Sequence, residues 1–150
     1  MRRKYLFILL FLIFGAIGTL DMGANKTPLA AKEEVVLTPE KDLYSTLLSL
    51  HVQCPEIVYA QAILETGNFT SNVCIEYNNL FGLYNSKVGD YYRFDNWMDS
   101  VVFYIENIQS KYRPQNNYYQ FLENLGYAQD PSYIDKIKEI VSNGRIRKES

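Results

Sequence analysis

The most informative part of the chain is the stretch Ala60-Gln61-Ala62-Ile63-Leu64-Glu65-Thr66-Gly67-Asn68-Phe69. Together with residues 57–59, its first half is apolar on every side, which is typical of a helix buried in a core. Gly67 suits the left-handed position just beyond a helix end. Glu65 is therefore predicted to lie in the last turn of this helix, on an otherwise buried element.

Glu65 is the first candidate for a functional side chain. The negative end of the helix dipole disfavours an ionised carboxyl, and partial burial also raises the pKa of a carboxyl. A carboxyl that stays protonated near neutral pH is what a general acid requires. The alternative is an ordinary glutamate at a frayed, solvated helix end, and the chemistry of this stretch alone does not separate the two.

The first 24 residues are predicted to be a secretory signal peptide. Three basic residues at positions 2–4 precede an apolar run over residues 5–17, which is the arrangement of an export signal. The run is shorter than the ~20 residues that span a bilayer, although an uncleaved membrane anchor is the alternative. We expect an exported protein of the periplasm, cell envelope or extracellular space, with a tether over residues 25–37 and one folded domain over residues 38–146.

Composition excludes some classes of function. The chain has 15 Lys and Arg against 17 Asp and Glu, and an acidic domain is a poor candidate for binding nucleic acid. Its 13 tyrosines have an apolar face and a polar tip, so their excess suggests a groove that stacks on sugar rings, although most of them are expected to pack in the core or its rim. His51 is the single histidine of the chain, and we expect neither a metal site nor another cofactor.

The two cysteines, Cys54 and Cys74, fall in the part that is predicted to be exported. In an oxidising compartment they could form a disulfide. However, the helix from Cys54 to Glu65 would be roughly 16 Å long, and the chain would have to return that distance in a few residues. Two buried thiols are therefore favoured over a disulfide.

The remaining pattern predicts about five helices and at most a small sheet. Thr38-Pro39-Glu40 predicts a helix start with a capping hydroxyl. Pro55 opens the helix that ends at Glu65. Residues 71–77 could form a short helical piece. Further helices are expected after Asp95 or Asn96, at residues 118–125 closed by Gly126, and from Asp130-Pro131 to Gly144. The aromatic runs 80–84 and 91–94 could form a hairpin. The fold class is therefore mainly α.

Four segments in this order resemble the bacterial peptidoglycan glucosaminidases of glycoside hydrolase family 73. They are Gln61-Ala62-Ile63-Leu64-Glu65-Thr66-Gly67, Asn78-Asn79-Leu80-Phe81-Gly82, Phe94-Asp95-Asn96-Trp97-Met98-Asp99-Ser100-Val101 and Gly126-Tyr127-Ala128-Gln129-Asp130-Pro131-Ser132-Tyr133. The resemblance implies a lysozyme-like helical domain with a cleft beside a small, shortened hairpin lobe. It also implies an enzyme that hydrolyses the β-1,4 bond after N-acetylglucosamine in peptidoglycan glycan strands. We expect this enzyme to be a monomer.

The resemblance also implies roles for particular residues. Glu65 matches the catalytic acid, and Tyr127 matches a cleft tyrosine that helps to position the reacting sugar. Asn79, Phe81 and Gly82 match the segment that forms the cleft floor, and Tyr84, Tyr91 and Tyr92 are expected to line a groove for amino sugars. Tyr133 and Trp97 are assigned to packing.

The chain departs from the family in the small lobe, which commonly carries a second carboxylate. Asp90 is the one acid of the short segment at residues 85–90 and is the candidate. Asp95 is interpreted as a helix cap and Glu76 as a solvated residue. Assistance by the acetamido group of the substrate, oriented by Tyr127, is the alternative. A lytic transglycosylase and a catalytically weak glycan-binding or scaffold protein remain the alternative functions.

Overall fold

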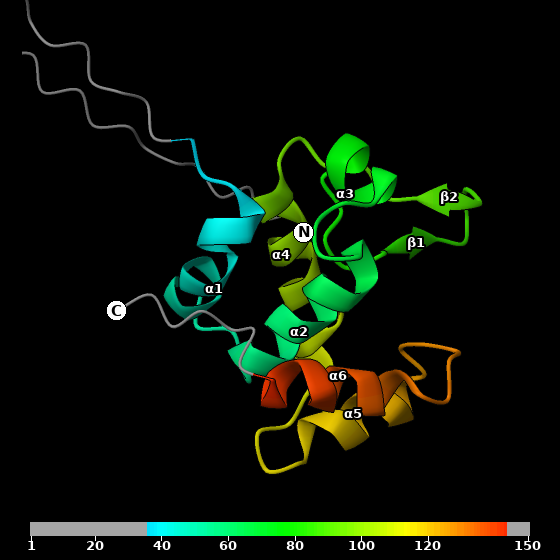
Figure 1. The fold of residues 1–150 in the computed structure, drawn as a ribbon. Helices are drawn as coiled ribbons and strands as arrows, with labels where there is room; N and C mark the ends of the chain where they lie inside the picture. The colour runs from blue at the N-terminus through cyan, green and yellow to red at the C-terminus, as the bar shows by residue number, and fades with distance from the viewer. Residues whose placement is uncertain (1–35, 144–150) are drawn as a thin grey trace, which may run out of the picture. The chain divides into compact units, whose positions relative to one another are not determined.

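The computed structural model describes residues 36–143 as a mainly helical domain with one small hairpin (Figure 1). The elements are α1 (Pro39–Ser49), α2 (Pro55–Thr66), α3 (Asn72–Tyr77), β1 (Tyr84–Asn85), β2 (Asp90–Tyr91), α4 (Trp97–Asn107), the 3-10 helix η1 (Gln109–Lys111), α5 (Tyr118–Leu125) and α6 (Tyr133–Ser142). The predicted fold class, a lysozyme-like helical domain with a shortened hairpin, is thereby confirmed. The predicted leader, the tether up to residue 35 and the helix end at Gly144 lie outside the described residues.

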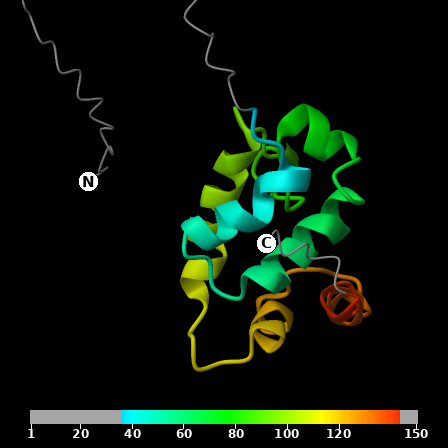
Figure 2. The same cartoon turned by 60° about the vertical axis from the view of Figure 1, so that its left-hand side comes forward.

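Helix α2 is the central element of this domain. It packs against α1 and against α6, and Figures 1 and 2 show it between them. Val58, Ala60 and Ala62 have no exposed surface, as predicted from its uniformly apolar sequence. Gly67 follows its last turn at φ 57° and ψ 49°, the left-handed conformation that the glycine was expected to adopt.

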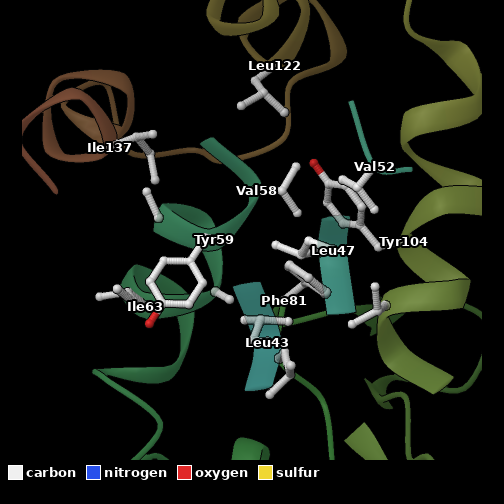
Figure 3. Close-up of a cluster of buried hydrophobic side chains, with 14 of the residues drawn as sticks. Leu43, Leu47, Val52, Val58, Tyr59, Ile63, Phe81, Tyr104, Leu122 and Ile137 are labelled. Atoms are coloured by element: carbon white, nitrogen blue, oxygen red, sulfur yellow. The ribbon is translucent and has the colours of Figure 1, made fainter. Parts of the chain in front are cut away.

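The core surrounds α2 with side chains from most of the other helices. Figure 3 shows Leu43 and Leu47 of α1 close to Phe81 and Tyr104, with Leu122 and Ile137 on the side of α5 and α6. Leu43, Leu47 and Ile137 have no exposed surface. Burial of each such side chain stabilises the fold by about 1.5–3 kcal/mol before its conformational entropy is counted.

The hairpin is shorter than the aromatic runs suggested. Strands β1 and β2 pair antiparallel over two residues each, with Tyr84 opposite Tyr91 and Asn85 opposite Asp90. Residues 80–83 form a buried turn instead of a strand. Asn79 holds this turn, because its side-chain oxygen accepts from the Leu83 amide at 3.0 Å and its nitrogen donates to the Leu83 carbonyl at 2.9 Å.

Two helix starts differ from the sequence-based expectation. At α1, the Thr38 hydroxyl forms no capping bond, and the Asp42 carboxylate accepts from the Thr38 amide at 2.7 Å. Helix α6 begins at Tyr133, two residues after Pro131. The Asp130 carboxylate accepts from the Ser132 amide at 2.9 Å, so this short polar turn delays the helix.

The start of α4 resolves the choice between two predicted caps. Asn96 is the cap, since its side chain accepts from the Asp99 amide while the Asp99 carboxylate accepts from the Asn96 amide. This reciprocal capping box satisfies two amides that the first helical turn leaves open. Asp95, the other candidate, precedes the cap.

Both cysteines are free thiols, as favoured from the sequence. Cys74 is buried in α3, and Cys54 is half-buried at the start of α2. Within residues 36–143, the helices are all too short or too polar to cross a lipid bilayer.

Candidate active site

A cavity of about 640 Å³ opens beside the end of α2 and the hairpin. Its walls come from residues far apart in the sequence: Glu65, Phe81, Gly82, Leu83, Tyr84, Tyr92, Phe103, Glu106, Asn107, Ile108, Lys111, Leu125, Gly126 and Tyr127. Its volume lies in the range of small-molecule sites, and its mixture of aromatic, amide and charged groups can both stack on a ligand and hydrogen-bond to it. We define this cavity as the cleft.

Glu65 is the carboxyl that the end of α2 delivers to the cleft wall. It is half-buried, and burial raises its pKa, while a hydrogen bond from the Tyr133 hydroxyl lowers it in part. This direction agrees with the expected shift, and the half-buried side chain differs from an ordinary glutamate at a frayed, solvated helix end. Such a carboxyl can remain protonated at a pH where an exposed glutamate is ionised.

Gly82 allows the turn after Asn79 to pass very close to Glu65. A Cβ atom at position 82 would lie 2.9 Å from the Glu65 Oε2 atom, which is closer than such contacts occur. The glycine also has φ 58°, a backbone conformation that disfavours other residues. The predicted floor segment is therefore in contact with the predicted acid, and a side chain at position 82 would displace the end of the Glu65 side chain.

Tyr127 lies in the cleft wall, but its hydroxyl is already engaged by the protein. It donates to the Phe81 carbonyl at 3.1 Å, and its ring packs against Tyr104 and Tyr133. Burial raises the pKa of Tyr127 well above its usual value, with further contributions from Tyr133 and Glu65. In this conformation Tyr127 holds the turn at Phe81 in place beside Glu65.

The other residues expected in the floor and groove divide into two groups. Phe81, Tyr84 and Tyr92 line the cleft, whereas Asn79 and Tyr91 do not. Asn79 is 1 % exposed and supports the turn from within. Tyr91 is on the exposed hairpin with its ring edge-on to Tyr84 at a centroid distance of 5.4 Å.

The acids considered as a second carboxylate lie away from the cleft. Asp90 is on β2, where it pairs with Arg93 at 3.3 Å and accepts from the Tyr91 amide at 2.8 Å. Neither Asp90, Glu76 nor Asp95 lines the cleft. The catalytic assignment of Asp90 remains a prediction, and its geometry gives it no direct support.

Sequence reasoning missed two residues of the site. Glu106, on the exposed side of α4, is the other carboxylate among the lining residues. Tyr133 was assigned to packing, yet its buried hydroxyl reaches Glu65 from the first turn of α6. The sequence around Glu106 and Tyr133 does not mark either of them as a site residue, since polar residues on a helix surface and tyrosines in a core are both common.

Two further expectations concerned metal ligands and Trp97. Within the part of the chain that the structure describes, no three His, Cys, Asp or Glu side chains are grouped as they would be around a metal ion. Trp97 is buried at the start of α4, where its indole donates to the Leu37 carbonyl at 3.3 Å. It packs, as expected, and does not line the cleft.

Comparison with known proteins identifies the family. The family model described as mannosyl-glycoprotein endo-beta-N-acetylglucosaminidase matches residues 41–145. The chain therefore belongs to this family of glycoside hydrolases, and the resemblance carried by the four motifs is confirmed. It is also similar to the exo-glucosaminidase LytG of Bacillus subtilis (strain 168), with 26% identity over 182 aligned positions and 93% of this chain covered. The chain spans 64% of the length of that relative.

The contact between Gly82 and Glu65 leads to a prediction with a matched control. Gly82→Ala and Gly126→Ala both place a side chain at positive φ, 58° and 64°, so each should lower the free energy of unfolding by about 1–2 kcal/mol. A Cβ at position 126 meets nothing within 4 Å. Only Gly82→Ala should therefore alter the NMR signal of the Glu65 carboxyl carbon. An unchanged Glu65 signal in Gly82→Ala would show that the close approach is absent.

Proposed function

We propose that this member of the glucosaminidase family hydrolyses the β-1,4 bond after N-acetylglucosamine in peptidoglycan, with Glu65 as the general acid. The observation that carries the proposal is the half-buried Glu65 carboxyl, which lines the cleft and whose pKa is raised by burial. Glycoside hydrolysis needs a protonated carboxyl beside the leaving oxygen. Burial supplies that protonation state at a pH where an exposed glutamate has lost its proton.

The walls of the cleft support a sugar polymer as the substrate. Tyr84 and Tyr92 contribute aromatic surface from the hairpin side, on which the apolar face of a pyranose can stack. Asn107 and Lys111 contribute hydrogen-bond donors from α4 and η1. These donors suit the hydroxyl, acetamido and carboxylate groups of an alternating amino-sugar strand.

We further propose Glu106 as the second carboxyl of the reaction. It lines the same cleft as Glu65 but comes from a different element, α4. A carboxylate on another wall can activate water or stabilise the charge that develops on the sugar ring. Asp90 is held instead by Arg93 on the exposed hairpin.

The place of action that we propose is the cell envelope. The support is the predicted export signal at residues 1–24 and the nature of the proposed substrate, which lies outside the cytoplasmic membrane. The domain over residues 38–146 would then act on the cell wall after its delivery.

Glu65→Gln tests the catalytic acid. The amide cannot donate a proton as a carboxylic acid does, so we expect at least a ~100-fold loss in the release of fragments from purified peptidoglycan. On the alkaline side, wild-type activity should fall as pH rises through the raised Glu65 pKa, and should therefore persist above the range of an ordinary glutamate. Glu56→Gln, at the other end of α2, is the control and should retain activity.

The products of the same digestion separate the alternative functions. Mass spectra showing a reducing N-acetylglucosamine end support the proposal, whereas anhydro-muramic ends would identify a lytic transglycosylase. Binding to sacculi without any fragment release would identify a glycan-binding protein. Full activity of Glu65→Gln would refute the assignment of the acid.

Glu106→Gln and Asp90→Asn test the second carboxyl against each other. If Glu106 activates water or stabilises charge, its amide should lower the rate by about 100-fold, while Asp90→Asn should have little effect. The measurement is the initial rate of fragment release. The reverse pattern would assign the function to Asp90, and activity in both variants would favour assistance by the substrate acetamido group.

Cell fractionation tests the proposed location. The full chain should be recovered in the envelope or the medium, whereas a chain without residues 2–24 should remain in the cytoplasm, because the basic and apolar leader is the export signal. Recovery of the full chain in the cytoplasm would contradict the proposal.

A further inference from the structure

A continuous line of hydrogen-bonded side chains runs through the core to Glu65. The Gln109 amide donates to the Tyr118 hydroxyl at 3.0 Å, and the Tyr118 and Tyr104 hydroxyls lie 2.9 Å apart. Tyr104 donates to the Gln61 carbonyl oxygen at 2.7 Å, and the Gln61 amide donates to the Tyr133 hydroxyl at 3.1 Å. The Tyr133 hydroxyl, whose proton is not used on Gln61, also interacts with the Glu65 carboxyl, and this interaction lowers the pKa of Glu65 and raises that of Tyr133.

The far end of this line is fixed by the backbone at Gln53. The backbone N–H of Gln53 can only donate, and it donates to the side-chain oxygen of Gln109 at 2.9 Å. The Gln109 nitrogen must then face the Gln53 carbonyl, at 2.9 Å, and the Tyr118 hydroxyl. The side-chain amide of Gln109 therefore cannot rotate by 180° without placing two donors against each other.

This anchor sets the direction of the bonds that follow. Each tyrosine hydroxyl has one proton. The Tyr104 proton is used on the Gln61 oxygen, so Tyr118 must donate to Tyr104. With its oxygen so engaged, Gln61 presents its nitrogen to Tyr133, and the Tyr133 proton is left for Glu65.

The opposite orientation of the Gln61 side-chain amide would leave one buried hydroxyl proton without an acceptor. If its oxygen faced Tyr133, the Tyr133 proton would bond to Gln61 and not to Glu65. The Tyr104 proton would turn to Tyr118, and the proton of Tyr118 would have no acceptor. In the observed orientation, every buried side-chain nitrogen and oxygen of residues 36–143 has a partner.

We propose that this hydrogen-bond line fixes the Tyr133 hydroxyl as a permanent donor to Glu65, which makes Tyr133 a positioning residue for the acid. The role in catalysis rests on the proposed function, but the donation itself does not. Once Glu65 has given up its proton, the Tyr133 hydroxyl stabilises the carboxylate that remains. It also holds the carboxyl in one orientation toward the cleft.

Other titratable groups border the same part of the cleft and stay unchanged in the test. They are Tyr127 after α5, Glu106 and Lys111 of α4 and η1, and Tyr84 and Tyr92 of the hairpin side. Because all variants below retain them, a difference in the titration of Glu65 reports on the hydrogen-bond line alone.

The test is the titration of the Glu65 carboxyl carbon by NMR in the full chain labelled with ¹³C-glutamate, assigned with Glu65→Gln. Tyr133→Phe removes the donor and should move the Glu65 midpoint to higher pH. Tyr104→Phe frees Gln61 to accept the Tyr133 proton, and should move the midpoint in the same direction. The double variant should match Tyr133→Phe alone, because both changes remove one donation.

Tyr112→Phe is the matched control. The Tyr112 side chain is also buried, but its hydroxyl donates to the Asn116 carbonyl at 2.6 Å, outside the line. The Glu65 midpoint should not move. An unchanged midpoint in Tyr133→Phe would overturn the donation, and an unchanged midpoint in Tyr104→Phe would overturn its control by the line.

If Tyr104→Phe does not fold, Tyr118→Phe replaces it. It removes the link between Gln109 and Tyr104 but leaves Gln61 as the acceptor of the Tyr104 proton. The Glu65 midpoint should therefore stay near its wild-type value, whereas a shift as large as that of Tyr133→Phe would overturn the proposal. The outcome of these titrations can be distinguished from the outcome of the activity test of the proposed function. Fragment release by Glu65→Gln together with these shifts would reject the function and leave the hydrogen-bond line in place.

Discussion

The burial of α2 is the constraint on which the rest of the domain depends. A helix that is apolar on every side must be covered on every side, and α1 and α6 provide part of that cover. The backbone of the last turn of α2 is therefore enclosed, while the carboxyl of Glu65 in the same turn still reaches the cleft. Gly67 ends the helix at this point, and Glu65 is left half-buried between the core and the cleft.

The spacing along α2 links the core to the cleft. Gln61 and Glu65 are four residues apart and therefore lie on one face of the helix, one turn from each other. The Tyr133 hydroxyl of α6 accepts from the Gln61 side-chain amide at 3.1 Å and also interacts with the Glu65 carboxyl. Packing of α6 against α2 thus does more than bury apolar surface, since it also brings a hydroxyl donor to the one carboxyl of the last turn.

How far the sequence could predict this site follows from the range of each interaction. Local rules were sufficient for α2, for α5 closed by Gly126 and for the position of Glu65 in the last turn of α2, because helix periodicity and terminal glycines act within a few residues. They failed for Tyr133, whose contact with Glu65 joins positions 68 apart in the sequence. They failed equally for Glu106, which belongs to the site only because α4 faces the cleft. The hairpin was predicted too long because Asn79 binds residues 81–83 as a turn.

The buried hydroxyls of Tyr104 and Tyr118 are difficult to explain by stability alone. A hydrogen-bonded pair of buried polar groups gains little over apolar groups of the same shape, because each hydroxyl loses its water on folding. Phenylalanine would keep most of the ring packing around Phe81 and Phe121. Phenylalanine, however, has no hydroxyl and cannot determine which of its neighbours donates a hydrogen bond and which accepts one. The hydrogen-bond line begins at the backbone amide of Gln53 and ends at Glu65, a carboxyl with a raised pKa. In the role that we propose, the two hydroxyls orient the Tyr133 donor toward that carboxyl, which packing alone would not do. Burial favours the protonated form of Glu65, and the interaction with Tyr133 offsets part of that effect.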